Sequence, residues 1–142
     1  MKETESNDLY RTLSAVSEEA VYKEKGSRFI GAAFPVSSEE EIAGIIHKIK
    51  NEHHKARHCC YAYRIGAEQE QYRVNDDGEP SHSAGMPIYG QILSFGLTNV
   101  LVTVVRYFGG VKLGAGGLMN AYKTAAQLTL EKAEVITKSI DR

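Results

Sequence analysis

Residues 100–118 read VLVTVVRYFGGVKLGAGGL, and this stretch decides the fold. Its first six residues are apolar or β-branched without interruption, which is typical of a central strand covered on both faces. A glycine-rich loop follows, from Gly109 to Gly117. Apolar residues then recur at helical spacing and predict a helix that ends near Lys132; they are Leu118, Ala121, Tyr122 and Ala125.

The residues before this stretch predict two strands, a helix and a hairpin. Residues 20–23 and 28–32 fit strands on either side of the turn Gly26-Ser27. Two serines followed by three glutamates form a capping box and predict a helix from Glu39 to about His53. Its apolar face consists of Ile42, Ile45, Ile46 and Ile49. Residues 57–65 and 71–75 fit the two strands of a hairpin.

A strong turn at residues 76–80 separates this hairpin from a second helix, which Pro87 starts and which ends near Gly96. Residues 134–140 fit either a last strand or a tail. The order of elements predicts an α+β fold, a mixed or antiparallel β-sheet with helices packed on it. We expect a mobile N-terminal tail over residues 1–17, one domain over 18–135 and a C-terminal tail over 136–142.

The composition is that of an ordinary soluble globular domain, with 142 residues, 42% apolar and 25% charged. The net charge of −1 excludes a global basic excess, but the charges are unevenly spread. Residues 1–79 hold 15 acids and residues 80–130 hold none, while the bases of that stretch are Arg106, Lys112 and Lys123. Such a stretch is either an anion-facing surface or a buried core segment.

The cysteine pattern and the N-terminus both favour the cytoplasm. Cys59 and Cys60 are adjacent and have no other partner, which argues against a disulfide scaffold. Residues 1–10 are polar and acidic, unlike a targeting peptide. No apolar run approaches the roughly 18–20 residues that span a membrane, so we expect no membrane partner.

The two glycine-containing loops each lead to a predicted helix N-terminus, where free backbone N–H groups and the helix dipole attract anions. Arg106 and Lys112 would add positive charge there. The phosphate motifs of known folds are absent, because Ala115 replaces the P-loop lysine and Met119 breaks a dinucleotide fingerprint. The alternative is that the glycines serve tight packing and positive-φ turns.

The longer motifs resemble the Impact/YigZ-like family over about residues 18–130. The resemblance rests on Lys25-Gly26-Ser27-Arg28-Phe29-Ile30, Ala56-Arg57-His58, Asp76-Asp77-Gly78-Glu79-Pro80-Ser81, Ala84-Gly85-Met86-Pro87, the run from Val104 to Leu118, and Ala121-Tyr122. It implies a fold similar to the second domain of a small-subunit ribosomal protein (S-five-like) and a nucleic-acid-binding role. Eukaryotic members act in translational control through another N-terminal module, which we expect to be absent here.

Two departures from the family pattern stand out. His82-Ser83 replaces the usual Gly-Thr, so a hydroxyl is kept but a flexible glycine is lost. Bacterial members carry a second, ferredoxin-like domain after the third helix, and the chain stops at Arg142, too early for one. It is therefore either a single-domain member or a fragment of a longer protein.

Each candidate site residue has a structural alternative. Arg106 would either bind phosphate or form an ion pair with Asp76, Asp77 or Glu79. Lys112 and Lys123 would either bind the anion or only aid solubility. Arg57 and His58 would either join the same surface or only solvate a strand edge. The predicted anion-binding set is Arg57, His58, Arg106, Gly109, Gly110, Lys112, Gly114, Gly116, Gly117 and Lys123. Beside it lies the family-motif loop of Asp76, Asp77, Gly78, Glu79, Pro80, Ser81, Ser83 and Gly85.

We predict no catalytic residue, metal or cofactor. The acids of the motif loop fit turn chemistry better than a cation site. His58 is badly placed to activate Cys59, and Ser81-His82-Ser83 forms no triad. Tyr107 and Phe108 fit either base stacking or the core.

Three functions remain open. The first is a non-catalytic RNA-binding or ribosome-associated protein linked to regulation of translation. The second is an enzyme acting on a small phosphorylated or acidic ligand. The third is a protein-interaction module that binds a translation-regulatory protein.

Overall fold

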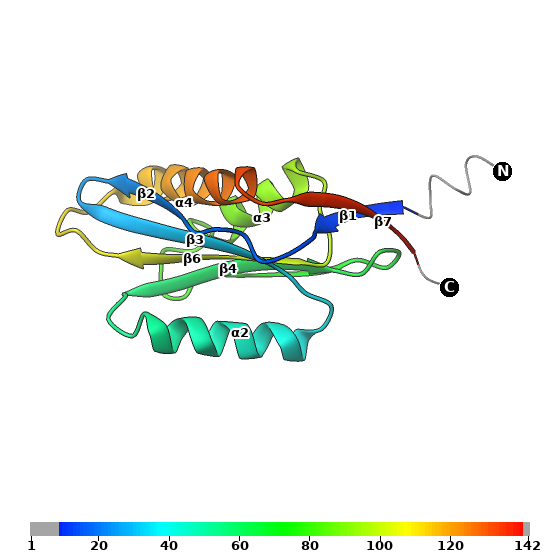
Figure 1. Ribbon diagram of the computed structural model, residues 1–142. Helices are drawn as coiled ribbons and strands as arrows, with labels where there is room; N and C mark the ends of the chain where they lie inside the picture. Colours follow the sequence, from blue (N-terminus) through cyan, green and yellow to red (C-terminus); the bar gives the residue numbers. More distant parts are fainter. Residues whose placement is uncertain (1–8, 141–142) are drawn as a thin grey trace.

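The computed structural model describes residues 9–140, and Figure 1 shows a sheet with helices on both of its faces. The central sheet is antiparallel throughout, and its strand order is β2 (Ala20–Glu24), β3 (Ser27–Pro35), β6 (Val100–Tyr107), β4 (His58–Ile65) and β5 (Gln71–Asn75). One face carries α3 (Gly85–Ser94) and α4 (Gly114–Glu131), and the other carries α2 (Glu39–Glu52). The predicted α+β class is confirmed.

Strand β6 lies at the centre of the sheet, as its sequence predicts. Residues 100–106 are all buried, and the strand pairs with β3 on one side and β4 on the other. Its even-numbered valines join the core beneath α3 and α4, whereas Leu101 and Val105 pack toward α2. Arg106 continues the even-numbered series, so its side chain emerges among the core residues of the α3–α4 face.

Helix α2 begins at the predicted capping box. The Ser38 hydroxyl accepts the Glu41 N–H at 3.2 Å, and the Glu41 carboxylate accepts the Ser37 N–H at 2.9 Å. The first bond satisfies an amide of the first helical turn, and the second ties the residue before the N-cap to the helix. Ile42, Ile46 and Ile49 are buried against the sheet.

The larger core lies between the sheet and the pair α3–α4. Phe29 of β3 and Tyr122 of α4 are fully buried there, and their rings meet edge to face at 5.1 Å. Both helices begin earlier than predicted, α3 at Gly85 and α4 at Gly114. The last glycines of the expected loop are therefore the first turn of α4.

Within the described residues, the segments expected as terminal tails contain paired strands, and at residues 134–140 the strand alternative holds. β1 (Leu9–Leu13) pairs antiparallel with β7 (Val135–Ser139) at one end of the molecule. Leu13 is buried as part of the larger core, and the Ser14 N–H donates to the Glu134 carbonyl at 3.0 Å. Neither strand has a strong sequence pattern of its own. Each is stabilised by pairing with a segment from the opposite end of the chain. The tail predictions for residues 1–8 and 141–142 lie outside the described residues.

Between residues 9 and 140, no helix is both long and apolar enough to cross a membrane.

Candidate anion-binding site

The glycine-rich segment holds the end of β6 against the β2–β3 turn before α4 begins. A Cβ on Gly109 would lie 2.0 Å from the Gly26 carbonyl carbon, so only glycine permits this approach. The Ser27 hydroxyl also accepts the Gly109 N–H at 3.1 Å. Gly116 differs, because a Cβ there would meet open space within the first turn of α4. The fold therefore explains Gly109 but gives no reason for Gly116.

The first turn of α4 is open. Its N-cap residue, Leu113, makes no side-chain cap hydrogen bond, and the turn contains no acid. Gly114 and Ala115 line a pocket of about 360 Å³ together with Arg57 and Lys112. Free amide N–H groups and the positive end of the helix dipole thus meet two exposed cations. This combination favours an anion.

The N-terminus of α3, which the sequence also presents as an anion site, is already occupied by the chain itself. The Asp76 carboxylate accepts the N–H groups of His82, Ala84 and Gly85 at 2.9, 3.2 and 2.8 Å. The prediction of an anion site at this second loop is therefore wrong. A fixed carboxylate satisfies these amides and repels a further anion.

A buried ion pair forms the inner wall of the α4 pocket. Arg106 is 5% exposed, and its Nη1 donates to both Glu79 carboxylate oxygens at 3.0 and 2.9 Å. Tyr122 O–H donates to the same carboxylate at 2.5 Å, and burial strongly raises the pKa of Tyr122. The ion-pair alternative for Arg106 is thus present in the structure. Its Nε, also buried, has no partner among the described residues.

The other polar groups of the motif loop are also held internally. His58 Nδ1 lies 2.7 Å from the Asp77 carbonyl oxygen, which can only accept, so Nδ1 carries a proton. His58 Nε2 lies 3.5 Å from Glu79 Oε1. The Asp77 carboxylate accepts the Cys59 N–H at 2.7 Å. The Asp77 and Glu79 side chains therefore have structural partners within the fold. Within residues 9–140, no three His, Cys, Asp or Glu side chains are grouped so that they could hold a metal ion.

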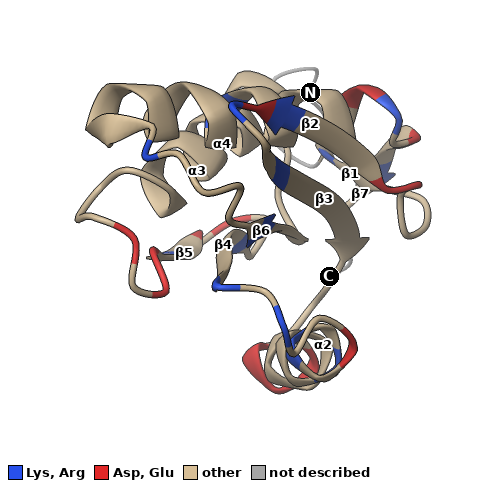
Figure 2. Ribbon diagram, turned by 90° about the vertical axis from the view of Figure 1, so that its left-hand side faces the viewer, with Lys and Arg blue, Asp and Glu red and all other residues tan. Residues whose placement is uncertain are grey.

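The outer wall combines charge with an aromatic ring. The Arg57 guanidinium lies 4.9 Å above the centre of the Phe108 ring, and Phe108 is 37% exposed. The Arg106 guanidinium also lies over this ring, 5.5 Å from its centre, so the same aromatic side chain contacts two cations. Figure 2 views this end of the molecule, with Lys and Arg segments around the ends of β3, β4 and β6 and the acidic motif loop beside β5.

The structure brings five of the ten predicted binding residues together in one pocket. Arg57, His58, Arg106, Lys112 and Gly114 line one pocket. Lys123 lines a different pocket, with His82, Met86 and Met119. Sequence reasoning missed three contributors: Ser27, Ala115 and Tyr122. All three lie within the family motifs, but only the fold brings Ser27 and Tyr122 together with Arg106 and Glu79.

His82, which replaces the glycine of the family pattern, has an unfavourable backbone conformation. Its φ is +67°, in the left-handed region that favours glycine. The glycine that the family pattern has at this position would therefore fit the backbone better than His82 does. Ser83 keeps a structural bond, because its hydroxyl donates to the Pro80 carbonyl at 2.6 Å.

The two cysteines are expected to be unreactive in the folded protein. Both are buried, and burial raises the pKa of Cys59 to about 11 and that of Cys60 further. Because the thiolate is the reactive form, a disulfide reagent such as Ellman's at pH near 8 should react with neither thiol until denaturant is added. Rapid reaction of a native thiol would contradict the burial of both.

Residues 25–130 match the family described as the Impact N-terminal domain. IMPACT family member YvyE of Bacillus subtilis is 41% identical over 133 residues, which are 94% of this chain and 61% of that protein. The crystal structure of a hypothetical protein superposes with a TM-score of 0.88 at 32% identity, covering 93% of this chain and 65% of that one. The two-domain translational regulator Yih1 is similar with a TM-score of 0.51 at 25% identity, covering 84% of this chain and 46% of that one. The chain thus spans about six-tenths of the length of the YvyE protein.

Proposed function

This chain belongs to the Impact family, and on that premise we propose that it is a cytoplasmic, translation-linked protein that binds RNA phosphates at the first turn of α4. The link to translation is supported by the similarity to Yih1, which is described as a translational regulator. The choice of RNA phosphate as ligand is supported by the chemistry of the α4 pocket.

The observation that carries the proposal is the contrast between the two helix N-termini. At α3 the chain supplies its own carboxylate, Asp76. At α4 it supplies no acid, and Arg57 and Lys112 stand beside free amides. Among the described residues that line the pocket, Glu79 is the one carboxylate, and Arg106 neutralises it. A phosphate entering this pocket would meet donors and no unpaired negative charge.

Phe108 favours a nucleic acid over a bare phosphate ion. A partly exposed ring beside two cations is the arrangement by which proteins hold single-stranded bases and backbone together. The enzyme alternative is less well supported, because both Glu79 oxygens and His58 Nδ1 already have partners. A general acid or base must be free to exchange a proton with a substrate.

A protein-interaction role is the second candidate, and one observation favours it. Met86 and Met119 are 40% and 48% exposed and line one apolar pocket between α3 and α4. Exposed methionines are common at adaptable protein-binding surfaces.

The proposal predicts salt-dependent RNA binding that depends on Arg57 and Lys112. In fluorescence anisotropy with labelled single-stranded RNA, Arg57→Ala combined with Lys112→Ala should weaken binding by about tenfold or more at low salt. Because two phosphate contacts are lost, the slope of log affinity against log salt should fall by about 1.4.

The matched control is Arg11→Ala combined with Lys138→Ala. It removes the same two residue types from the exposed β1–β7 ribbon. Equal losses of RNA affinity in the two double variants would mean that the RNA is attracted by the general charge of the protein and not by the α4 pocket. Absence of binding at low salt would contradict the proposal outright.

A further inference from the structure

The two faces of the central sheet are unequally covered. Helices α3 and α4 lie over one face, whereas α2 lies alone on the other (Figure 1). Five strands span about 19 Å and a helix with its side chains covers about 10 Å, so one helix covers roughly half of a face. The buried isoleucines of α2 pack against residues of β4 and β6. Within residues 9–140, no helix therefore covers the half of this face formed by β2 and β3.

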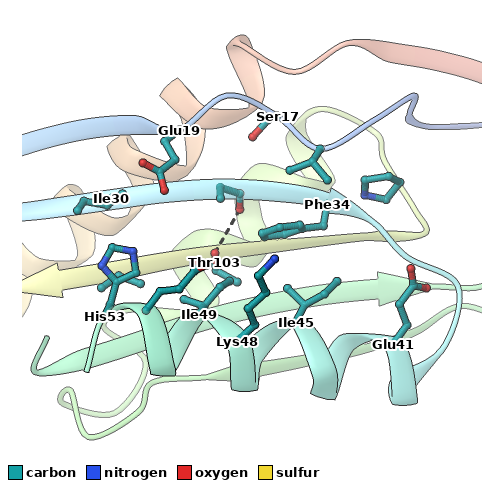
Figure 3. A pocket seen from close by; sticks show the side chains of 15 residues that line it. Ser17, Glu19, Ile30, Phe34, Glu41, Ile45, Lys48, Ile49, His53 and Thr103 are labelled. Atoms are coloured by element: carbon teal, nitrogen blue, oxygen red, sulfur yellow. Dashed lines mark hydrogen bonds between the residues drawn. The ribbon is translucent and has the colours of Figure 1, made fainter. Parts of the chain in front are cut away.

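A groove of about 390 Å³ lies at this boundary, between α2 and β3 (Figure 3). Its floor is apolar and includes Ile30, Ala32 and Phe34 of β3, each half-buried. Ile45 forms the α2 side of the groove. The apolar surface continues beyond the floor, because Val21, which pairs with Ile30, is 49% exposed. A continuous apolar surface of this kind marks an interaction site.

The rim of the groove is acidic on both sides. Glu19 reaches toward it from the segment before β2, and Glu41 stands on α2 opposite (Figure 3). Glu52 adds a third acid from the other end of α2. Lys48 is the only lysine or arginine among the described residues that line the groove, and it rises from α2 between these acids. The net negative rim complements a basic occupant.

We propose that this groove docks a basic amphipathic helix of a partner protein, which lies beside α2 over β2 and β3. A helix is the occupant that completes the layer, since two helices already cover the opposite face. Its apolar side would pack on Ile30, Phe34 and Ile45, and lysines or arginines at its edges would meet Glu19 on one side and Glu41 on the other. The groove lies on the α2 face, apart from the α4 pocket, so this inference does not depend on RNA binding.

The test uses a stapled helical peptide of about 15 residues. Leucines form its apolar face, and lysines flank that face on both edges. A control peptide carries glutamates in place of the lysines. Titration up to about 1 mM, followed by anisotropy, should show binding of the lysine peptide and none of the glutamate peptide.

Two neighbouring glutamates give a matched pair of protein variants. Glu19→Lys reverses a rim charge and should lower the affinity for the lysine peptide by about tenfold. Glu18→Lys makes the same change outside the groove lining and should alter that affinity by less than about twofold. Ala32→Trp fills the groove from its floor and should block binding, provided that its thermal unfolding shows a folded protein.

Several results would overturn the proposal. They are no binding of the lysine peptide, equal binding of the glutamate peptide, equal weakening by Glu18→Lys and Glu19→Lys, and unchanged binding by a folded Ala32→Trp. Sedimentation that showed a dimer broken by the groove variants would instead assign the groove to a second copy of the chain.

Discussion

Replacing Arg106 with methionine is expected to lower the free energy of unfolding by about 3–5 kcal/mol, because it leaves the buried Glu79 carboxylate without its cation. Glu79 is 8% exposed, and Tyr122 O–H would be its main remaining donor. Glu79→Gln should be destabilising for the reciprocal reason, since the Arg106 guanidinium would then be buried without a counter-charge. Urea denaturation followed by circular dichroism measures both changes.

The double variant Arg106→Met with Glu79→Leu is expected to recover much of the loss. Replacing both members of a buried pair removes the unpaired charge together with the cost of burying it. Arg57→Met is the control, because Arg57 is exposed and should change the free energy of unfolding by no more than about 0.5 kcal/mol. If Arg106→Met cost no more than Arg57→Met, the pair would not be a structural element of the pocket wall.

Introducing an acid at the start of α4 should weaken RNA binding strongly without harming the fold. Ala115 is exposed, lies in the first turn of α4 and lines the pocket. In Ala115→Glu, a carboxylate would stand where Asp76 stands at α3, satisfying the helix N-terminus and repelling phosphate. Stability should hold or rise by about 0.3–1 kcal/mol, as acids near helix N-termini do. RNA affinity at low salt should fall by about tenfold or more, measured by anisotropy.

Ala115→Gln separates charge from size. It has the same shape as the glutamate variant and no charge, so it should retain most of the RNA affinity. Equal loss in the two variants would mean that the pocket is sterically blocked, and unchanged affinity in Ala115→Glu would place RNA elsewhere on the protein.

The sequence predicted the elements whose signals are local. The apolar run at residues 100–105 identified β6, and the serine–glutamate pair before Ile42 identified the start of α2. The hairpin strand at residues 71–75 agreed with the structure at both ends. In each case the residues that define the element lie within a few positions of one another.

What the sequence missed depends on contacts between distant residues. β1 and β7 pair across almost the whole chain, so no local signal marked β1, and residues 134–140 fitted a tail as well as a strand. Arg106 had three candidate partners by sequence, and only the packing of the motif loop onto β6 selects Glu79. Likewise, the occupation of the α3 N-terminus by Asp76 follows from the path of the turn, which no periodicity encodes.

The central claim is that the N-terminus of α4, and not that of α3, receives the anion. Amide chemical shifts recorded by NMR during titration with a short single-stranded RNA test it most directly. The account predicts that the amides of Gly114, Ala115 and Gly116 shift with added RNA, whereas those of Ala84 and Gly85, already bonded to Asp76, stay in place. Shifts at Ala84 and Gly85 with none at the start of α4 would contradict it.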